Sequence, residues 1–438
     1  MDKSFALVSL GCAKNLVNSE QMLYLLDEAG YTLVPDPDGA DFCIVNTCGF
    51  IDAAKSEAID AILEMAELKR QGRLGALIVT GCLAERYQDT ILAELPEIDA
   101  VLGISSFGDI VKAVNALSLG QQPRFFADRN APVEEIGRIV STGPGWAYLR
   151  IAEGCSNFCA FCAIPYIRGR YRSRSMENVL AEAKDLAAHG IRELIVIAQD
   201  ITRYGTDLYG KRCLAQLIRE LSAIEGVEWL RLHYLYPDQF DDELIDEIAS
   251  NPKVVKYLDI PIQHINNGIL RRMNRKGTGD EIRELFARLR ERIPGLVLRT
   301  SLIAGLPGEG EAEFEELCEF LREARIERAG VFPFSPEEGT PAAAMSHVDE
   351  DEAQRRAELI LALQQPIMDE FCEGFVGQTL RVLVERYDED EQRWVGRSYA
   401  DSPGIDGEVH FEGFAREGEF ADVRILAAED GILYGEEA

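Results

Sequence analysis

The sequence predicts an α/β protein in three parts: a parallel α/β block, an open (β/α)6 barrel and a small antiparallel β-barrel. Two observations predict this. Short apolar runs alternate with helix-length stretches over most of the chain, and after Gly374 this pattern gives way to short strands separated by Gly and Asp. The 438 residues also exceed what one core usually organises. We therefore expect domains at residues 1–120, 146–374 and 375–438, with a linker at residues 121–145.

The first block contains four apolar runs, which predict buried parallel strands, with helical segments between them. The strands are expected at Phe5–Leu10, Phe42–Asn46, Ala76–Thr80 and Val101–Ile104, and helices at Ser19–Ala29 and Asp52–Arg70. The following segment, 121–145, has weak periodicity and ends in Gly-Pro-Gly, which is typical of a linker.

The second block repeats the alternation with six strands, and the third has short strands alone. The six are expected at Ala147–Ile151, Glu193–Ala198, Trp229–Leu235, Tyr257–Ile260, Val297–Ile303 and Ala329–Phe334. Six β/α units predict an open or incomplete barrel, with chemistry at the carboxyl ends of its strands. In the third block, strands are expected at Thr379–Arg386, Arg393–Ala400, Gly407–Glu412 and Phe420–Leu426. Such short strands predict a small antiparallel barrel or sandwich.

Charge and cysteine usage narrow the class of protein. The chain has 45 Lys plus Arg against 76 Asp plus Glu, a formal charge of -31. This disfavours attraction to nucleic-acid phosphates or an anionic membrane and favours a basic protein partner. No apolar run approaches the roughly 18 residues of a membrane helix, so we expect a cytoplasmic protein. Ten cysteines are too few for a disulfide scaffold, and clustered ones are expected to bind metal or react.

Three cysteines form a CxxxCxxC motif after the first strand of the second block. This loop cysteine set is Cys155, Cys159 and Cys162. Structural zinc takes four ligands, and the nearest histidine, His189, lies at the far end of the next expected helix. Iron–sulfur clusters used for electron transfer also normally take four cysteines, whereas three leave one iron free for a substrate. The incomplete set therefore favours an open iron–sulfur cluster over zinc or a disulfide.

Three further cysteines each follow an apolar run of the first block and adjoin a glycine. This N-terminal cysteine set is Cys12, Cys48 and Cys82. Parallel strands bring such positions to one edge of a sheet, and glycine lets the backbone approach an inorganic centre. A lone cysteine there would be a small core hydrophobe, but three equivalent positions favour a shared cluster. The remaining cysteines are expected in the core: Cys43, Cys213, Cys318 and Cys372.

The CxxxCxxC motif, with Phe161 before its last cysteine and at the first strand end of a β/α domain, resembles that of the radical S-adenosylmethionine (SAM) superfamily. The resemblance implies that the open iron binds SAM and that one electron splits it to a deoxyadenosyl radical. It also implies SAM contacts at Phe161, Gln199 and Ser301, although ordinary loop capping is the alternative for the last two. The basic run Ile167–Arg174 is either a solvated loop or a contact for a carboxylate.

The two cysteine sets and the C-terminal strands together resemble the methylthiotransferases, radical SAM enzymes with a second open cluster and a TRAM β-barrel. The stretches SLGCAKNLVNSE and NTCGFI are similar to the branch that methylthiolates an aspartate of the twelfth small-subunit ribosomal protein, although Asn18 replaces that branch's usual aspartate. The resemblance implies two 4Fe-4S clusters: the loop set generates the radical and the N-terminal set presents sulfur. A second SAM supplies the methyl group, flavodoxin or ferredoxin donates electrons, and no catalytic side chain is implied beyond the six ligands.

Two alternatives remain: the same chemistry on a tRNA adenosine, and a non-catalytic iron–sulfur electron carrier. From Phe371 onward there are 17 Asp plus Glu against 6 Arg and no Lys, so this part would repel RNA. A merely acidic, solvated surface also accounts for that charge. We expect the C-terminal domain to dock the basic ribosomal protein. Two incomplete ligand sets disfavour the carrier.

Overall fold

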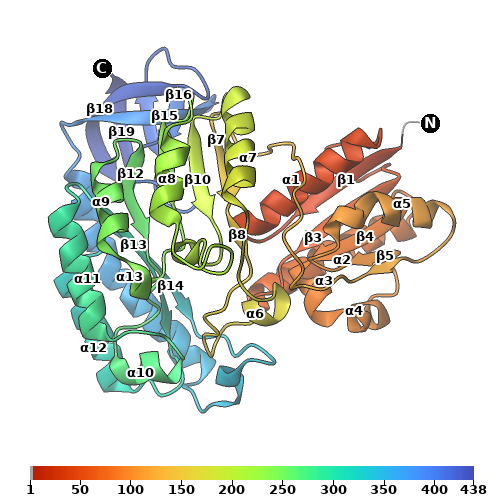
Figure 1. The fold of residues 1–438 in the computed structure, drawn as a ribbon, viewed down its shortest axis with the longest axis horizontal. Helices are drawn as coiled ribbons and strands as arrows, with labels where there is room; N and C mark the ends of the chain where they lie inside the picture. The colour runs from red at the N-terminus through yellow and green to blue at the C-terminus, as the bar shows by residue number, and fades with distance from the viewer. Residues whose placement is uncertain (1–2) are drawn as a thin grey trace. The chain divides into compact units, whose positions relative to one another are not determined.

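The structure is a computed structural model that describes residues 3–438 (Figure 1). The chain forms two compact units. The first comprises the described residues up to Ser141 together with Ala152–Arg174 and Ser335–Ala343. The second comprises Thr142–Ile151, Ser175–Phe334 and Ala344–Ala438.

The first unit is built on a six-stranded parallel sheet of order β2-β1-β3-β4-β5-β6. Its strands are β1 (Ser4–Ser9), β2 (Thr32–Leu33), β3 (Phe42–Thr47), β4 (Ala76–Gly81), β5 (Ala100–Leu102) and β6 (Arg124–Phe125). Its helices are α1 (Ala13–Glu28), α2 (Asp52–Arg70), α3 (Cys82–Tyr87), α4 (Asp89–Glu94), η1 (Phe107–Asp109), α5 (Ile110–Ser118) and α6 (Ile164–Ile167). A short antiparallel pair joins β8 (Ala152–Glu153) to β9 (Arg172–Ser173).

Both faces of this sheet carry apolar side chains, and helices cover both faces. Side chains of α2, α3 and α4 pack on one face, where Ile62 and Val79 are fully buried. Those of α1 and α5 pack on the other, around Leu26 and Ile110. The strand order reverses between β1 and β3, and in such folds ligands bind at the carboxyl ends of the strands beside that reversal.

The second unit contains an open parallel sheet of order β14-β13-β12-β11-β10-β7. Its strands are β7 (Trp146–Arg150), β10 (Glu193–Ile197), β11 (Trp229–Leu232), β12 (Val254–Asp259), β13 (Val297–Ala304) and β14 (Arg328–Pro333). Its helices are α7 (Met176–Ala188), η2 (Ile201–Arg203), α8 (Leu214–Ser222), η3 (Pro237–Gln239), α9 (Asp242–Ser250), α10 (Asn267–Arg272), α11 (Gly279–Arg292), α12 (Glu311–Ala324) and α13 (Glu350–Glu373). The short helix η4 (Pro341–Ala344) begins in the last segment of the first unit. Local signals set helix starts: Thr278 and Glu281 form a capping box at α11.

A closed five-stranded barrel, drawn in blue in Figure 1, completes the second unit. It consists of β15 (Thr379–Asp388), β16 (Arg393–Arg397), β17 (Val409–Glu412), β18 (Phe420–Glu429) and β19 (Ile432–Glu437). Its order is β15-β16-β17-β19-β18, and only the β17–β19 pair is parallel among the pairings of these strands. The apolar interior of the barrel is continuous with Trp229, Tyr257 and Val297 of the open sheet. The barrel therefore shares one core with that sheet.

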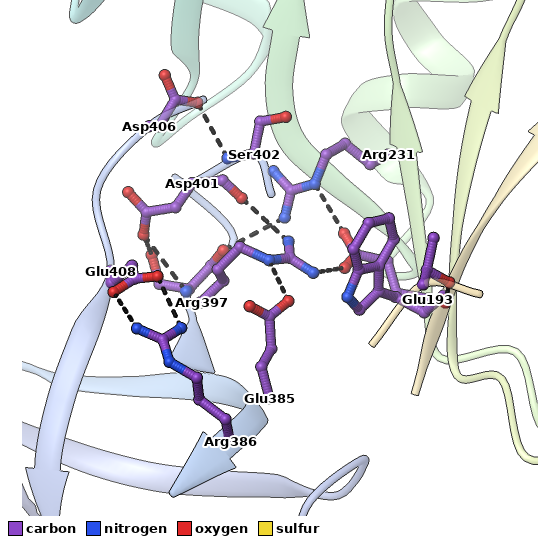
Figure 2. Close-up of polar contacts among 12 residues, drawn as sticks. Glu193, Arg231, Glu385, Arg386, Arg397, Asp401, Ser402, Asp406 and Glu408 are labelled. Atoms are coloured by element: carbon purple, nitrogen blue, oxygen red, sulfur yellow. Dashed lines mark hydrogen bonds and ion pairs between the residues drawn. The ribbon is translucent and has the colours of Figure 1, made fainter. Parts of the chain in front are cut away.

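A buried ionic network joins the barrel to the amino ends of the open sheet (Figure 2). Glu193, the first residue of β10, accepts hydrogen bonds from Arg231 and Arg397, each at 2.7 Å. All three side chains are at most 1% exposed. Arg231 also donates to the carbonyl oxygens of Ser398 and Tyr399. Charge pairing and apolar packing thus act at the same junction.

The structure confirms the expected fold class, with differences in detail. Helix α1 begins at Ala13 rather than Ser19, because the polar residues of its first turn, including Lys14 and Asn15, are buried instead of forming a loop. Strand β6 lies inside the segment 121–145, which we expected to be only a linker; two residues are too few for a recognisable pattern. Strand β19 was missed, and it pairs parallel to β17 in a barrel expected to be antiparallel. Within the described residues, no helix is both long and apolar enough to cross a membrane.

Candidate functional site

The N-terminal cysteine set lies at the carboxyl ends of three neighbouring strands. Cys12 follows β1 and is the N-cap residue of α1, Cys48 follows β3, and Cys82 begins α3 directly after β4. Strands β1 and β3 flank the reversal of strand order, and β4 is the next strand along. The structure thus brings all three residues to the ligand-binding edge of a doubly wound sheet.

Glycines beside these cysteines allow the three strand ends to approach closely. Gly11 has a φ of 90°, and a Cβ there would lie 2.8 Å from Cys48 Cβ and 3.2 Å from Cys48 Sγ. Gly81 has a φ of 98°, and a Cβ there would lie 2.4 Å from the carbonyl oxygen of Thr47. Any larger residue would be strained and would push these strand ends apart.

Asn15 and Arg168 form a polar support around the N-terminal cysteine set. Asn15 Nδ2 donates to the carbonyl oxygens of Leu10, at 2.9 Å, and Thr47, at 2.8 Å, which joins the ends of β1 and β3. Its Oδ1 accepts from Arg168 Nη2 at 2.7 Å and lies 3.8 Å from Cys82 Sγ. These hydrogen bonds fix the positions of the strand ends that carry the cysteines.

The thiols of the N-terminal cysteine set differ in acidity. Cys12 is exposed at the surface. Desolvation raises the pKa of its thiol, but the positive charges of Lys14 and Arg168 outweigh this, so the pKa lies below its ordinary value. Burial raises the pKa of Cys48, and it raises that of Cys82 to about 11 against the opposing charge of Arg168. Because metal ligands bind as thiolates, loading this set must release protons.

The loop cysteine set follows β8 in the same unit. Cys155 and Cys159 are each 9% exposed, and Cys162 is half-buried. The backbone N–H of Cys155 donates to the carbonyl oxygen of Gly169 at 3.1 Å, and that of Asn157 donates to Cys155 Sγ at 3.5 Å. Backbone N–H groups therefore hold this loop in place, and one of them donates to a thiol of the set.

The two cysteine sets lie side by side in the first unit. Ala163, which follows Cys162, packs with Ile167 of α6 against Cys82 and Ile104. Residues 335–343 contact the loop of the loop cysteine set, where Ala342 N donates to the carbonyl oxygen of Ala160 at 2.9 Å.

The same segment reaches the N-terminal cysteine set through a buried carboxylate. Glu337, 2% exposed, binds Arg86 at 2.8 Å and Lys55 at 3.0 Å. Arg86 in turn donates to the carbonyl oxygen of Gly49, the residue after Cys48, at 2.9 Å. One compact unit therefore carries all six cysteines and the side chains that support them.

The other residues singled out from the sequence are divided between the units. Phe161 is half-buried in the loop of the first unit, whereas Gln199, just beyond β10, and Ser301 belong to the second. Ser301 lies within β13, where its carbonyl oxygen accepts from Gln263 N at 2.9 Å. The isolated cysteines are buried as expected: Cys43, Cys213, Cys318 and Cys372.

Sequence reasoning missed several supporting residues. The basic run Ile167–Arg174 is not a solvated loop throughout, because Arg168 is 1% exposed and Arg174 is 8% exposed and paired with Glu135. The supporting role of Asn15 was also missed, although its position as a polar residue three places after Cys12 could have indicated it. In the described part of the chain, no three His, Cys, Asp or Glu side chains are grouped to hold a single metal ion.

Comparison with protein families gives three matches along the chain. Residues 149–321 match the radical SAM superfamily, residues 4–103 match the uncharacterized protein family UPF0004, and residues 376–437 match the TRAM domain. The first segment runs from within β7 into α12, the second contains β1, β3, β4 and β5 of the doubly wound sheet, and the third contains the closed barrel.

Similar curated proteins span the whole chain. Ribosomal protein uS12 methylthiotransferase RimO from Acetivibrio thermocellus is 46% identical over 100% of this chain and 98% of its own length. The protein of that name from Clostridium botulinum is 48% identical over 93% and 91%. The protein of that name from Thermoanaerobacter sp. is 45% identical over 99% of this chain and 100% of its own length.

Solved structures share the fold at much lower identity. The radical SAM methyltransferase TsrM from Kitasatospora setae has a TM-score of 0.58 at 14% identity, over 87% of this chain and 78% of that chain. The cobalamin-dependent radical enzyme OxsB has a TM-score of 0.51 at 13% identity, over 84% and 56%. At these identities the likeness concerns the fold alone.

Proposed function

This chain belongs to the RimO family of ribosomal protein uS12 methylthiotransferases, and from this premise we propose that it inserts a methylthio group at the β-carbon of an aspartate in uS12. The observation that carries the proposal is the identity of 45–48% with RimO proteins over nearly the full length of both chains. It is a radical SAM transferase with a TRAM domain.

The cofactors are two 4Fe-4S clusters and SAM. When bound, these groups would cleave one SAM by one-electron transfer, present the sulfur that is transferred, and provide the methyl group from a second SAM. The N-terminal cysteine set would hold the sulfur-presenting cluster, and the loop cysteine set would hold the radical-generating one. Three thiols in each set leave one coordination site open, which suits a cluster that must bind a further ligand. Phe161, Gln199 and Ser301 would contact SAM.

The chain's own residues prepare this chemistry in three ways. Gly11 and Gly81 let the strand ends close around a bulky group. Lys14 and Arg168 place positive charge beside thiols that must ionise to bind iron. The near-complete burial of Cys155 and Cys159 limits access of water to a radical reaction. Each feature supports the proposed roles of the two sets.

The domains and partners follow from the same proposal. We place a methylthiotransferase domain at residues 1–120, a linker at 121–145, a radical SAM domain at 146–374 and a TRAM domain at 375–438. The TRAM domain would dock the basic protein uS12, and a flavodoxin or ferredoxin would deliver electrons. The site of action would be the cytoplasm, and nucleic acid would not be the substrate.

The proposal is tested with anaerobically purified, reconstituted protein, reductant, SAM and uS12. We expect 5'-deoxyadenosine and a mass increase on uS12 that corresponds to replacement of one hydrogen by a methylthio group. We expect C12A to keep SAM cleavage and lose methylthiolation, because only the sulfur-presenting cluster is damaged. C155A is the matched variant and should lose both. Loss of SAM cleavage in C12A would contradict the separate roles of the two sets.

The alternatives give different results. Absence of 5'-deoxyadenosine from the wild-type reaction would favour the electron carrier. Mass spectrometry of ribosomal proteins and tRNA from a deletion strain distinguishes the two substrates. Loss of a modified tRNA base with uS12 unaffected would reject the protein substrate.

A further inference from the structure

One guanidinium group is buried between the two cysteine sets. Arg168 is 1% exposed, and its Nη1 donates to both carboxylate oxygens of Glu153, at 3.1 and 3.0 Å. Its Nη2 donates to Asn15 Oδ1 at 2.7 Å. Glu153 lies two residues before Cys155, and Asn15 lies in the first turn of the helix that Cys12 caps. A single side chain therefore joins the segments that carry the two sets.

The environment of Arg168 differs from that of an ordinary buried ion pair. Removing a guanidinium from water is costly and is offset only by nearby negative charge and well-placed acceptors. Glu153 supplies one negative charge. Asn15 Oδ1, which accepts from Arg168, lies only 3.8 Å from Cys82 Sγ. The guanidinium therefore lies near thiols that become anionic when they bind a cluster.

We propose that Arg168 is a positioning residue for the cluster of the N-terminal cysteine set: its charge offsets that of the thiolate ligands, and its hydrogen bonds to Asn15 and Glu153 fix the spacing of the two sets. This inference rests on the proposed function, because it requires a cluster at the N-terminal cysteine set.

The inference predicts shifts of opposite sign in the reduction potential of that cluster. Potentials of iron–sulfur clusters depend on net charge and on hydrogen bonds around the sulfurs. Loss of the guanidinium disfavours the more negative, reduced state, so R168M should shift the midpoint potential to more negative values. Loss of the Glu153 charge should shift it to more positive values. A general loosening of the site would move both variants in the same direction.

The experiment uses the full chain with the loop cysteine set replaced (C155A/C159A/C162A), so that only one cluster contributes to the signal. R168M, R168K and E153Q are made in this background and reconstituted anaerobically. The readouts are iron and sulfide content, iron loss to a chelator, and an EPR-monitored redox titration. We expect R168M to lose iron roughly tenfold faster, in line with other residues that support metal ligands. R168K should retain the parent potential, because the charge remains.

The matched control is R138M. Arg138 pairs with Glu20 at 2.7 Å, and these side chains are 4% and 1% exposed, so it also forms a buried ion pair of the first unit. R138M should leave the potential unchanged. Equal potentials for R168M and R138M, or shifts of R168M and E153Q in the same direction, would overturn the role of Arg168. A parent protein without any cluster would instead overturn the proposed function on which the inference rests.

Discussion

At the scale of single residues, Glu193 shows how a buried charge depends on its partners. Burial opposes ionisation of its carboxyl group, but Arg231 and Arg397 outweigh burial and hold the pKa below its ordinary value. Without that carboxylate, two guanidinium groups that are at most 1% exposed would lose their shared partner. Removing this carboxylate would leave Arg231 buried with only backbone carbonyl acceptors among the described residues, whereas Arg397 would keep Glu385 as a partner. A buried guanidinium that loses its carboxylate strongly destabilises the fold.

We expect E193Q to lower the free energy of unfolding by about 3–5 kcal/mol at neutral pH. The surface pair of Glu243 with Arg219, which are 68% and 52% exposed, provides the control, and E243Q should change stability by less than about 0.5 kcal/mol. Urea unfolding measures both. Equal stabilities of E193Q and E243Q would show that the network does not hold the barrel.

The same substitution has a defined pH dependence. The pKa of Glu193 is lowered by folding, so its stabilisation is present above the unfolded value of about 4.3 and is lost as pH falls through the lower folded value. The difference in unfolding free energy between wild type and E193Q should therefore shrink in acid. A difference that grows below pH 4 would contradict the assigned charge.

At the scale of elements, the turn from β4 into α3 is set by one glycine. Gly81 adopts a φ of 98°, and a Cβ there would lie 2.4 Å from the backbone oxygen of Thr47 on β3. Its position immediately before Cys82 couples the geometry of the strand end to that of the cysteine. A residue with a side chain would displace both.

We expect G81A to lower the free energy of unfolding by at least about 3 kcal/mol, because a backbone conformation essentially reserved for glycine (φ 98°, ψ −159°) adds to a collision with the β3 backbone. Gly72 has a similar φ of 71° but no atom within 4 Å of the Cβ position, so G72A should cost only about 1 kcal/mol. Urea unfolding measures both variants and compares a positive-φ position that is crowded by β3 with one that is open. Equal decreases in the free energy of unfolding would mean that β3 shifts to accommodate the added Cβ without loss of stability.

Elements were predictable from the sequence where their pattern was long. The apolar runs located β1, β3 and β4 because several consecutive buried residues leave a clear signal. Strands such as β2 and β6 have two residues each, and pairing rather than pattern creates them.

The cysteines of the candidate site were found because their chemistry is visible in the chain itself. Arg168 was not, because nothing in a run of arginines indicates which side chain will be buried against Glu153. Glu337 lies far along the chain from Arg86 and Lys55, so only the folded structure reveals their contact. Positions set by long-range pairing remain outside the reach of local patterns.

At the scale of the whole molecule, the net charge is -31, but only some of the carboxylates behind it are exposed to a partner. Several carboxylates near the barrel, such as Glu193 and Asp401, are buried in ion pairs and cannot attract a partner. Others, including Glu389, Asp390 and Glu417, are exposed on the barrel. Deleting residues 378–438 would uncover Trp229 and Tyr257, so surface variants test docking more cleanly than a truncation.

We expect E389Q/D390N/E417Q to slow association with uS12 by roughly tenfold at low ionic strength, since rim charges act mainly on the association rate. The effect should fade as salt is added. The control E57Q/D60N/E64Q removes the same charge from exposed positions of α2 and should change association much less. Stopped-flow binding measures both, and equal rates would place docking elsewhere.

The unit that carries all six cysteines is assembled from three separate stretches of chain, and the last of them is Ser335–Ala343. About three quarters of the polypeptide must therefore leave the ribosome before Glu337 can reach Arg86 and before Ala342 can reach Ala160. These contacts are therefore completed only after the segment Ser335–Ala343 has been synthesised. An N-terminal fragment that ends before Ser335 therefore lacks the contacts that Glu337 and Ala342 make in the folded unit.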